Sequence, residues 1–97
     1  MHKVKGNFYS SDNYLTSLAG CPSKVGGDFY SSYNKLTSLV GSPSEVGGNF
    51  YCKANNLTSL VGSPTKVGGS FYCAGNEVEF TEEQVRAICN VKGKVYV

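Results

Sequence analysis

Four tyrosines recur at intervals of 21 residues along this 97-residue chain, at Tyr9, Tyr30, Tyr51 and Tyr72. Tyrosine is common at binding sites because it offers a rigid apolar ring with a polar tip. Polar and charged residues flank the series, so the candidate partner-binding residues also include Asn7, Asp28, Asn49 and Lys53. A regular row of tyrosines also suits strands and stabilises a sheet without any ligand. The pattern predicts a binding surface, with a purely structural aromatic row as the alternative.

Residues that support catalysis or metal binding are sparse. The chain has one histidine, His2, and it has no G-x-S-x-G elbow, phosphate-binding loop or H-E-x-x-H motif. Its four cysteines form no C-x-x-C pair, so we expect no zinc site. The Gly-Gly-Asp at residues 26–28 meets only part of the calcium-binding pattern G-G-x-G-x-D. We therefore expect a protein that is not an enzyme and that has no cofactor and no metal.

The cysteines are better explained as small buried side chains. Cys52 and Cys73 occupy the same repeat position as Ser10 and Ser31, and the four residues follow one another at intervals of 21. This equivalence indicates an inward position that needs a small residue, which a free cysteine supplies. Stacked neighbours at such positions are close enough to bridge, so the redox state of Cys52 and Cys73 stays open. Without a signal sequence, a reducing compartment is the better expectation.

Charge and hydropathy exclude further classes. Nine Lys and Arg residues against seven Asp and Glu give a net charge of +2, and the basic residues are scattered singly. We therefore expect no electrostatic footprint for nucleic acid. One series of charges, Lys3, Lys24, Glu45 and Lys66, is expected to form a weak ladder of surface ion pairs. No segment reaches the length of a membrane span, so we expect a soluble, cytoplasmic protein without membrane contact.

The whole chain is organised by one repeat. Residues 46–66 read VGGNFYCKANNLTSLVGSPTK, and residues 4–24 and 25–45 are close copies without insertion or deletion. A fixed period of this size is typical of a solenoid, whose units bury their apolar faces only by stacking. We expect a single domain over residues 1–97, with coils at about 4–24, 25–45, 46–66 and 67–80, followed by a C-terminal cap over 81–97.

Each coil combines two patterns. Val25, Gly27, Phe29 and Ser31 alternate with outward residues, which predicts one short strand. An Asn corner follows, then an irregular return leg with leucines three apart, and then a Gly/Pro turn. Because a buried corner leaves backbone groups without strand partners, the stacked side chains of Asn13, Asn34, Asn55 and Asn76 are expected to bond the backbone of adjacent coils.

The end of the chain predicts a cap. Thr81 and Gln84 form a capping box for a short helix, and Val85, Ile88 and Cys89 are expected to share its core-facing side. Residues 94–97 are then expected to add a final strand. No equivalent cap precedes Val4, so the first coil is expected to expose an open edge.

The motif F-x-(S/C)-x-x-N-x-L-x-x-L resembles the leucine-rich repeat, L-x-L-x-x-N-x-L-x-x-L. Its fixed slots are taken by Phe50, Cys52, Asn55, Leu57 and Leu60. The 21-residue length and the recurring VGGxFYC and LTSL blocks resemble the short bacterial and bacteriophage subclass. This resemblance covers about residues 4–80 and implies a mainly β solenoid, a leucine-rich-repeat array with parallel strands and a non-helical or 3₁₀ return leg. It also implies a protein-recognition scaffold that is phage or prophage encoded.

Three functions remain open from the sequence. The first is a protein-protein interaction module that binds a host or phage protein through the Tyr-lined strand face. The second is a structural homo-oligomer that assembles through the uncapped N-terminal edge or the Tyr face. The third is a carbohydrate or nucleotide binder in which tyrosine rings stack on sugars or bases.

Overall fold

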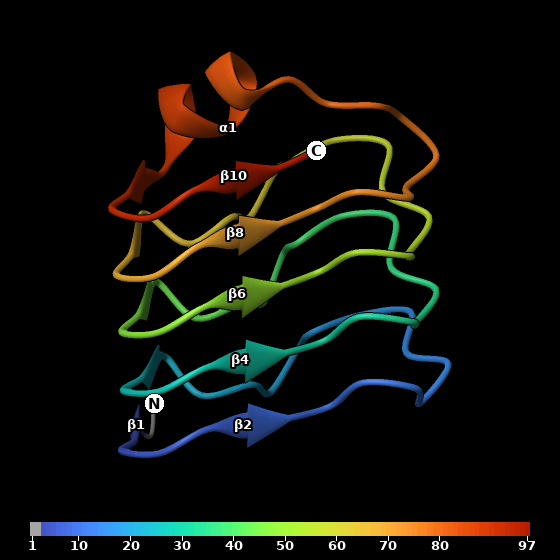
Figure 1. The fold of residues 1–97 in the computed structure, drawn as a ribbon. Helices are drawn as coiled ribbons and strands as arrows, with labels where there is room; N and C mark the ends of the chain where they lie inside the picture. Colours follow the sequence, from blue (N-terminus) through green and yellow to red (C-terminus); the bar gives the residue numbers. More distant parts are fainter. Residues whose placement is uncertain (1–2) are drawn as a thin grey trace.

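The protein is a solenoid of parallel strands with a short C-terminal helix and a final strand (Figure 1). The structure is a computed structural model that describes residues 3–97, and Met1 and His2 lie outside the described residues. Sheet A contains β1 (Lys3–Val4), β3 (Lys24–Val25), β5 (Glu45–Val46), β7 (Lys66–Val67) and β9 (Asn90–Val91). Sheet B contains β2 (Phe8–Tyr9), β4 (Phe29–Tyr30), β6 (Phe50–Tyr51), β8 (Phe71–Tyr72) and β10 (Val95–Tyr96). The expected solenoid of about 21-residue turns is therefore confirmed.

Each coil contributes two short strands, where the sequence pattern predicted one. The chain bends between Val25 and Phe29, so that β3 and β4 belong to different sheets. Glycine is required at this bend because the coils approach closely there. A Cβ on Gly47 would lie 2.2 Å from the carbonyl oxygen of Gly26. The single-strand expectation was wrong because the alternation of buried residues continues across the Gly-Gly bend and hides it.

The repeat stacks equivalent residues in register. Phe8 pairs with Phe29 and Phe29 with Phe50, each at its own slot in the next coil. Phe29, Phe50 and Phe71 are fully buried. The rings of Phe8, Phe29 and Phe50 stack at centroid distances of 5.6 and 5.4 Å, and the Phe71 ring lies 5.0 Å from that of Phe50 at a tilt of 41°. Each coil thus completes the core of its neighbours, which is the stabilisation expected of a solenoid.

The Asn corners form the expected hydrogen-bond ladder. Oδ1 of Asn34 accepts from the backbone N–H groups of Asn13 and Leu15 in the preceding coil, both at 2.9 Å. Its Nδ2 donates to the carbonyl oxygens of Ser10 and Ser31 at 2.9 and 3.0 Å. The side chains of Asn55 and Asn76 repeat this pattern one and two coils later. The corner backbone is therefore satisfied by side chains that bridge coils.

Helix α1 (Glu82–Ile88) begins with the expected capping box. Oγ1 of Thr81 accepts from the N–H of Gln84 at 3.1 Å, and Oε1 of Gln84 accepts from the N–H of Thr81 at 2.9 Å. Val85 and Cys89 are buried in the core as expected. Ile88 is 46% exposed, so the expectation that it faces the core was wrong. Ile88 instead lines a hollow beside the third coil, where the return leg of the fourth coil is missing.

The last eight residues form more than the single strand expected from them. β9 extends sheet A beside β7, and β10 extends sheet B beside β8. Residues 91–96 read VKGKVY and repeat the VKGNFY of residues 4–9. Arg86 of α1 holds this coil by donating to the carbonyl oxygens of Val91 and Gly93 at 2.7 and 2.8 Å. The C-terminal cap is thus a helix followed by a further half coil.

The first coil is less buried than its copies. Phe8 and Leu15 are only partly buried, whereas Phe29 and Leu36 in the next coil are fully buried. Tyr9 is 69% exposed. Within residues 3–97 the N-terminal edge of the stack is therefore the open edge that the sequence indicated. Among the same residues, no helix is long and apolar enough to cross a membrane.

Candidate binding surface on the tyrosine face

The predicted tyrosine row is a continuous stack of rings on sheet B. We call it the Tyr ladder, and it contains Tyr9, Tyr30, Tyr51, Tyr72 and Tyr96. Neighbouring ring centroids lie 4.5 to 4.8 Å apart, with interplanar angles of 6 to 13°. Tyr96 was missed by sequence reasoning because α1 lengthens the last interval from 21 to 24 residues. The V-K-G of residues 4–6 recurs at residues 91–93, and this repeat could have predicted the position of Tyr96.

Side chains at the Gly-Gly bend hold the ladder in position. Nδ2 of Asn7 donates to the Tyr9 hydroxyl at 2.9 Å, and Nδ2 of Asn49 donates to the Tyr51 hydroxyl at 3.0 Å. The Tyr30 hydroxyl instead donates to Oδ2 of Asp28 at 3.0 Å. This hydrogen bond, with further contributions from desolvation and from the Asp28 charge, raises the pKa of Tyr30 to about 12. The phenol of Tyr30 therefore stays protonated throughout the neutral range.

The same three flanking residues also bond the backbone of the next coil. Oδ1 of Asn7 accepts from the N–H of Asp28, and Oδ1 of Asp28 accepts from the N–H of Asn49, both at 2.7 Å. Oδ1 of Asn49 continues the series to the N–H of Ser70 at 2.8 Å. Asn7, Asp28 and Asn49 thus lie beside the ladder as predicted. One side-chain oxygen of each accepts a hydrogen bond from the backbone of the next coil, so these residues have a structural role.

A hollow lies on the other flank of the ladder. It has a volume of about 290 Å³ and is lined by Tyr30, Tyr51 and Tyr72 together with Ser32, Tyr33 and Lys53. We call this hollow the Tyr groove. Ser32 is 6% exposed, and within residues 3–97 its hydroxyl is a buried polar group without a hydrogen-bond partner. Buried hydroxyls are normally paired, so an unpaired hydroxyl on a residue that lines the groove is unusual.

The outer wall of the Tyr groove has an unusual backbone. Tyr33 has a φ of 58°, and its counterparts Asp12 and Ala54 have φ values of 59° and 55°. Gly75 occupies the same slot in the fourth coil with a φ of 72°. The Lys53 ammonium lies 5.6 Å from the centroid of the Tyr33 ring, which is a cation–π distance. Of these residues, Asp12 and Tyr33 line the Tyr groove, so the variable slot before Asn forms part of its wall in the first two coils.

Stacking limits what the rings themselves can contact. Tyr30, Tyr51 and Tyr72 each have a neighbouring ring on both faces, at 4.5 to 4.8 Å. A sugar or a base would need an open face for stacking. Only the terminal rings, Tyr9 and Tyr96, have a face without a ladder neighbour. The geometry therefore favours contacts with ring edges and hydroxyls over stacking on sugars or bases.

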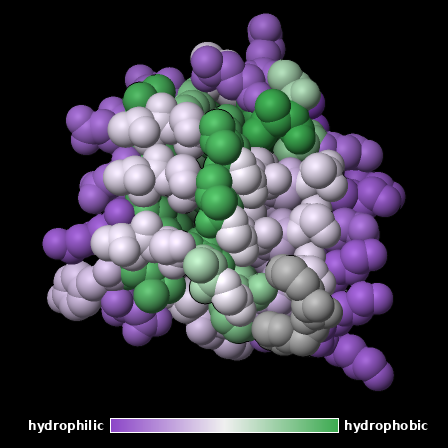
Figure 2. Space-filling view, turned by 180° about the vertical axis from the view of Figure 1, so that it is seen from behind, coloured by the Kyte–Doolittle hydropathy of each residue, from purple (hydrophilic) through white to green (hydrophobic). Residues whose placement is uncertain are grey.

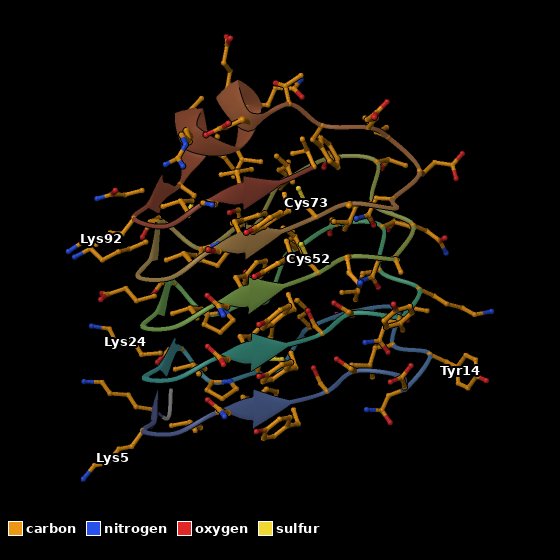
Figure 3. All side chains as sticks on the ribbon, in the orientation of Figure 1. Lys5, Tyr14, Lys24, Cys52, Cys73 and Lys92 are labelled. Atoms are coloured by element: carbon orange, nitrogen blue, oxygen red, sulfur yellow. The ribbon has the colours of Figure 1, made fainter. Side chains whose placement is uncertain are left out.

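The cysteines have no reactive environment. All four are free thiols and are buried, and Cys52 and Cys73 lie inside successive coils (Figure 3). Burial raises the pKa of Cys52 well above its usual value, and it raises the pKa of Cys73 to about 11. The thiolate is the nucleophilic form, so these side chains are poor nucleophiles at neutral pH. Among residues 3–97, no group of three or more His, Cys, Asp or Glu side chains is placed to hold a metal ion.

A second hollow lies on the opposite face, where Figure 2 shows a line of hydrophobic residues. It has a volume of about 500 Å³ and is lined by Leu60, Val61, Val78, Phe80 and Ile88, among others. Val61 and Ile88 are 62% and 46% exposed. The hollow exists because the fourth coil lacks an LTSL return leg, so nothing equivalent to residues 57–60 covers the third coil there.

Comparison with known proteins gives no relative for this chain. No family model matches it, and neither the curated proteins nor the solved structures contain a significant match.

Proposed function

We propose that this chain is a non-enzymatic binding module that docks a protein partner on the Tyr ladder and in the Tyr groove. The observation that carries the proposal is the buried, unpaired hydroxyl of Ser32 inside an apolar hollow beside a rigid row of tyrosines. Tyrosines in fixed positions lose little conformational entropy when a partner binds, which suits a recognition surface. A polar group from the partner would satisfy Ser32 and fix the register of binding.

The repeat motif supports a finer assignment. The Asn ladder and the F-x-(S/C)-x-x-N-x-L-x-x-L unit favour a protein of the leucine-rich-repeat type, and the short repeats favour a phage or prophage origin. That class is mainly a scaffold for protein recognition, so a host or phage protein is the proposed partner. Cytoplasmic location is part of the same proposal, because four unpaired cysteines suit a reducing compartment.

The roles of the eight predicted site residues divide within this proposal. Tyr30, Tyr51, Tyr72 and Lys53 would contact the partner, because they line the groove. Tyr9 would extend the surface at the open end of the ladder. Asn7, Asp28 and Asn49 would act by positioning the tyrosines, since their side chains bond the ladder hydroxyls and the next coil.

Affinity capture from a bacterial lysate tests the proposal with three chains. The first is the wild type, the second is Tyr51→Ser, and the third is Tyr14→Ser as a matched control. Tyr14 is 77% exposed and lies outside the ladder, so it has the same chemistry in a different place. A protein retained by the wild type and by Tyr14→Ser but lost by Tyr51→Ser supports the proposal, provided that circular dichroism shows equal folding. Equal capture by all three chains would contradict it.

Self-assembly is the second candidate because the first coil leaves Phe8 and Leu15 partly exposed. Lys3 and Lys5 place positive charge at this edge, which disfavours close pairing of two copies. Light-scattering mass decides between the two functions. If the protein is a monomer at micromolar concentration, the binding function is supported. If it forms a concentration-dependent dimer that Phe8→Ser abolishes, the structural role is supported instead.

A further inference from the structure

The solenoid gathers basic residues that are scattered in the sequence. The exposed side of sheet A is lined by Lys3, Lys5, Lys24, Lys66 and Lys92, which we call the basic strip. Figure 3 shows Lys5, Lys24 and Lys92 projecting from the same side of the molecule, away from Tyr14 on the opposite side. These residues are spread over 90 positions, but the repeat brings them to adjacent coils. The absence of a basic run in the sequence therefore gives a misleading picture of the surface.

The strip concentrates most of the positive charge of the protein. Its five lysines and one glutamate, Glu45, give it a net charge of +4. The whole chain has a net charge of +2, so the remainder of the molecule has a net charge of −2. The protein is therefore strongly polarised, and a polyanion would be attracted to this one side.

The shape of the strip is narrow and linear. Successive coils lie about 5 Å apart, so the four steps from the coil of Lys5 to that of Lys92 extend over about 19 Å. Lys3, Lys24 and Lys66 lie in one column, and Lys5 and Lys92 lie at the two ends of the neighbouring column. Between the lysines lies a shallow hollow of about 410 Å³ whose floor includes Gly26, Gly47 and Gly68. These glycines have no side chains to obstruct a ligand, and their positions in the coil are exposed. Lysine ammonium groups along a narrow strip, with exposed glycine backbone between them, match a single line of phosphates better than a flat anionic surface.

We propose that the basic strip binds the phosphate backbone of duplex DNA without regard to sequence. Duplex DNA has the high linear charge density that a line of lysines matches, and its binding releases condensed counterions. No aromatic ring lines the strip within residues 3–97, so base stacking is not part of this interaction. The exposed Asn90 lies in register with Lys66 at one end of the strip. An anionic membrane fits less well, because the exposed Val40, Val61 and Ile88 are among the return legs and the cap and would not enter the lipid.

One residue limits the strength of the interaction. Glu45 occupies the slot that is Lys24 in the coil before it and Lys66 in the coil after it. Its Oε2 lies 3.2 Å from Nζ of Lys24, so it neutralises one of the lysines. Among the described residues this is the one ion pair in the series, so the ladder of pairs expected from the sequence is reduced to Lys24 and Glu45. Lysine already occupies this slot in three other coils. The substitution Glu45→Lys should therefore fit the fold and increase binding.

The test measures fluorescence anisotropy of a labelled duplex at about 20 mM salt and at rising salt. For the wild type we expect affinity to fall with salt, with a log–log slope of about −3 to −4. Lys66→Glu should weaken binding about tenfold or more, and Glu45→Lys should strengthen it by a similar factor. Lys35→Glu is the matched control, because it makes the same change in net charge away from the strip, beside Tyr14. We expect it to weaken binding less than about twofold.

Three results would overturn the proposal. One is equal weakening by Lys66→Glu and Lys35→Glu, which would show that net charge alone is responsible. Another is wild-type affinity that does not depend on salt, or no binding at the lowest salt. The third is sedimentation with vesicles that contain phosphatidylserine while the duplex does not bind, which would assign the strip to a lipid surface.

Discussion

The Asn corner and the Gly-Gly bend of each coil solve the same problem in opposite ways. At both places the chain leaves a strand, and its backbone groups lose their regular partners. The Asn corner supplies the missing bonds with a buried side chain, as Asn34 shows with partners in two coils. The Gly-Gly bend removes side chains so that backbones meet directly, as when the Gly26 N–H donates to the Val4 carbonyl at 2.7 Å. The Asn corner therefore depends on the hydrogen bonds of a side chain, whereas the Gly-Gly bend depends on the absence of side chains.

The largest expected effect is at the Asn corner. Asn34→Ala would remove five hydrogen bonds and leave buried N–H and C=O groups of two coils without partners. We expect the free energy of unfolding to fall by about 3 kcal/mol or more, measured by urea denaturation. Asn13→Ala is the matched control, because Asn13 occupies the same slot but is exposed. Similar losses for both variants would show that the ladder is not the source of stability.

At the Gly-Gly bend we expect a smaller but clear cost from an added methyl group. A Cβ on Gly48 would lie 2.2 Å from Oδ1 of Asp28 and 2.9 Å from the carbonyl carbon of Gly27. Gly48→Ala should therefore destabilise the protein by about 2 kcal/mol. Gly6→Ala, in the same slot of the first coil, would place its Cβ more than 4 Å from every non-neighbouring atom of residues 3–97. We expect the melting temperature of Gly6→Ala to match that of the wild type and the melting temperature of Gly48→Ala to be lower. This result would confirm that close contact between coils is the constraint.

Substitution of Asp28 tests whether the Gly-Gly bend also depends on side-chain hydrogen bonds. Asp28→Asn keeps the oxygen that bonds the Asn49 N–H, and asparagine already occupies this slot at Asn7 and Asn49. We expect a change in stability below about 1 kcal/mol, whereas Asp28→Ala should cost about 1 kcal/mol more. In Asp28→Asn the pKa of Tyr30 should fall from about 12 towards its usual 10, because the carboxylate acceptor is gone. Ultraviolet titration of tyrosine measures this shift, and an unchanged titration would contradict the assigned cause.

The smallest effect at neutral pH is expected where the chain enters the Asn corner. The Ser31 hydroxyl donates to the Tyr51 carbonyl at 2.9 Å, and Sγ of Cys52 makes the equivalent bond to Tyr72 at 3.3 Å. Cys52→Ser/Cys73→Ser should therefore change stability at pH 7 by less than about 1 kcal/mol. A larger loss would show that the sulfur fills space that an oxygen does not.

The same double variant changes the response to alkaline pH. The pKa of Cys73 is about 11 in the folded protein and 9.0 for an ordinary cysteine, so the unfolded chain loses this proton first. The stability of the wild type is therefore complete below about pH 9 and falls as the pH rises to about 11. Without these two thiols we expect a smaller decline from pH 9 upward, because burial also raises the pKa values of Cys21 and Cys89, which remain, and Tyr30 contributes in the same direction above pH 10. Chemical denaturation at pH 8 to 11 measures the difference, and identical profiles would contradict it.

Sequence reasoning predicted the features that depend on one residue type in a fixed slot. The Asn ladder and the Thr81–Gln84 capping box were predicted from hydrogen-bonding capacity alone, and the structure confirms both. The break between β3 and β4 was not predicted, because Val25 and Phe29 keep the spacing of a continuous strand. The Tyr ladder was predicted except for Tyr96, whose interval is changed by α1.

Properties that depend on several coils at once were harder to predict. The basic strip is formed by five lysines of which only Lys3 and Lys5 lie close together in the sequence, so a search for basic runs cannot find it. The Tyr groove depends on the positive φ of Tyr33, which is a bulky residue that rarely adopts this conformation. The unpaired hydroxyl of Ser32 is likewise visible only when the stack is assembled.

The replacement of the fourth return leg by α1 also constrains how such a chain can change its length. A duplication that begins and ends at the same slot, between residues 25 and 66, would insert one whole coil and leave both terminal structures intact. A duplication after residue 80 would instead copy the helix and place it between coils, where the stack has no room for it. Growth by recombination is therefore expected within the middle coils, and each added coil would lengthen the Tyr ladder by one ring and sheet A by one strand.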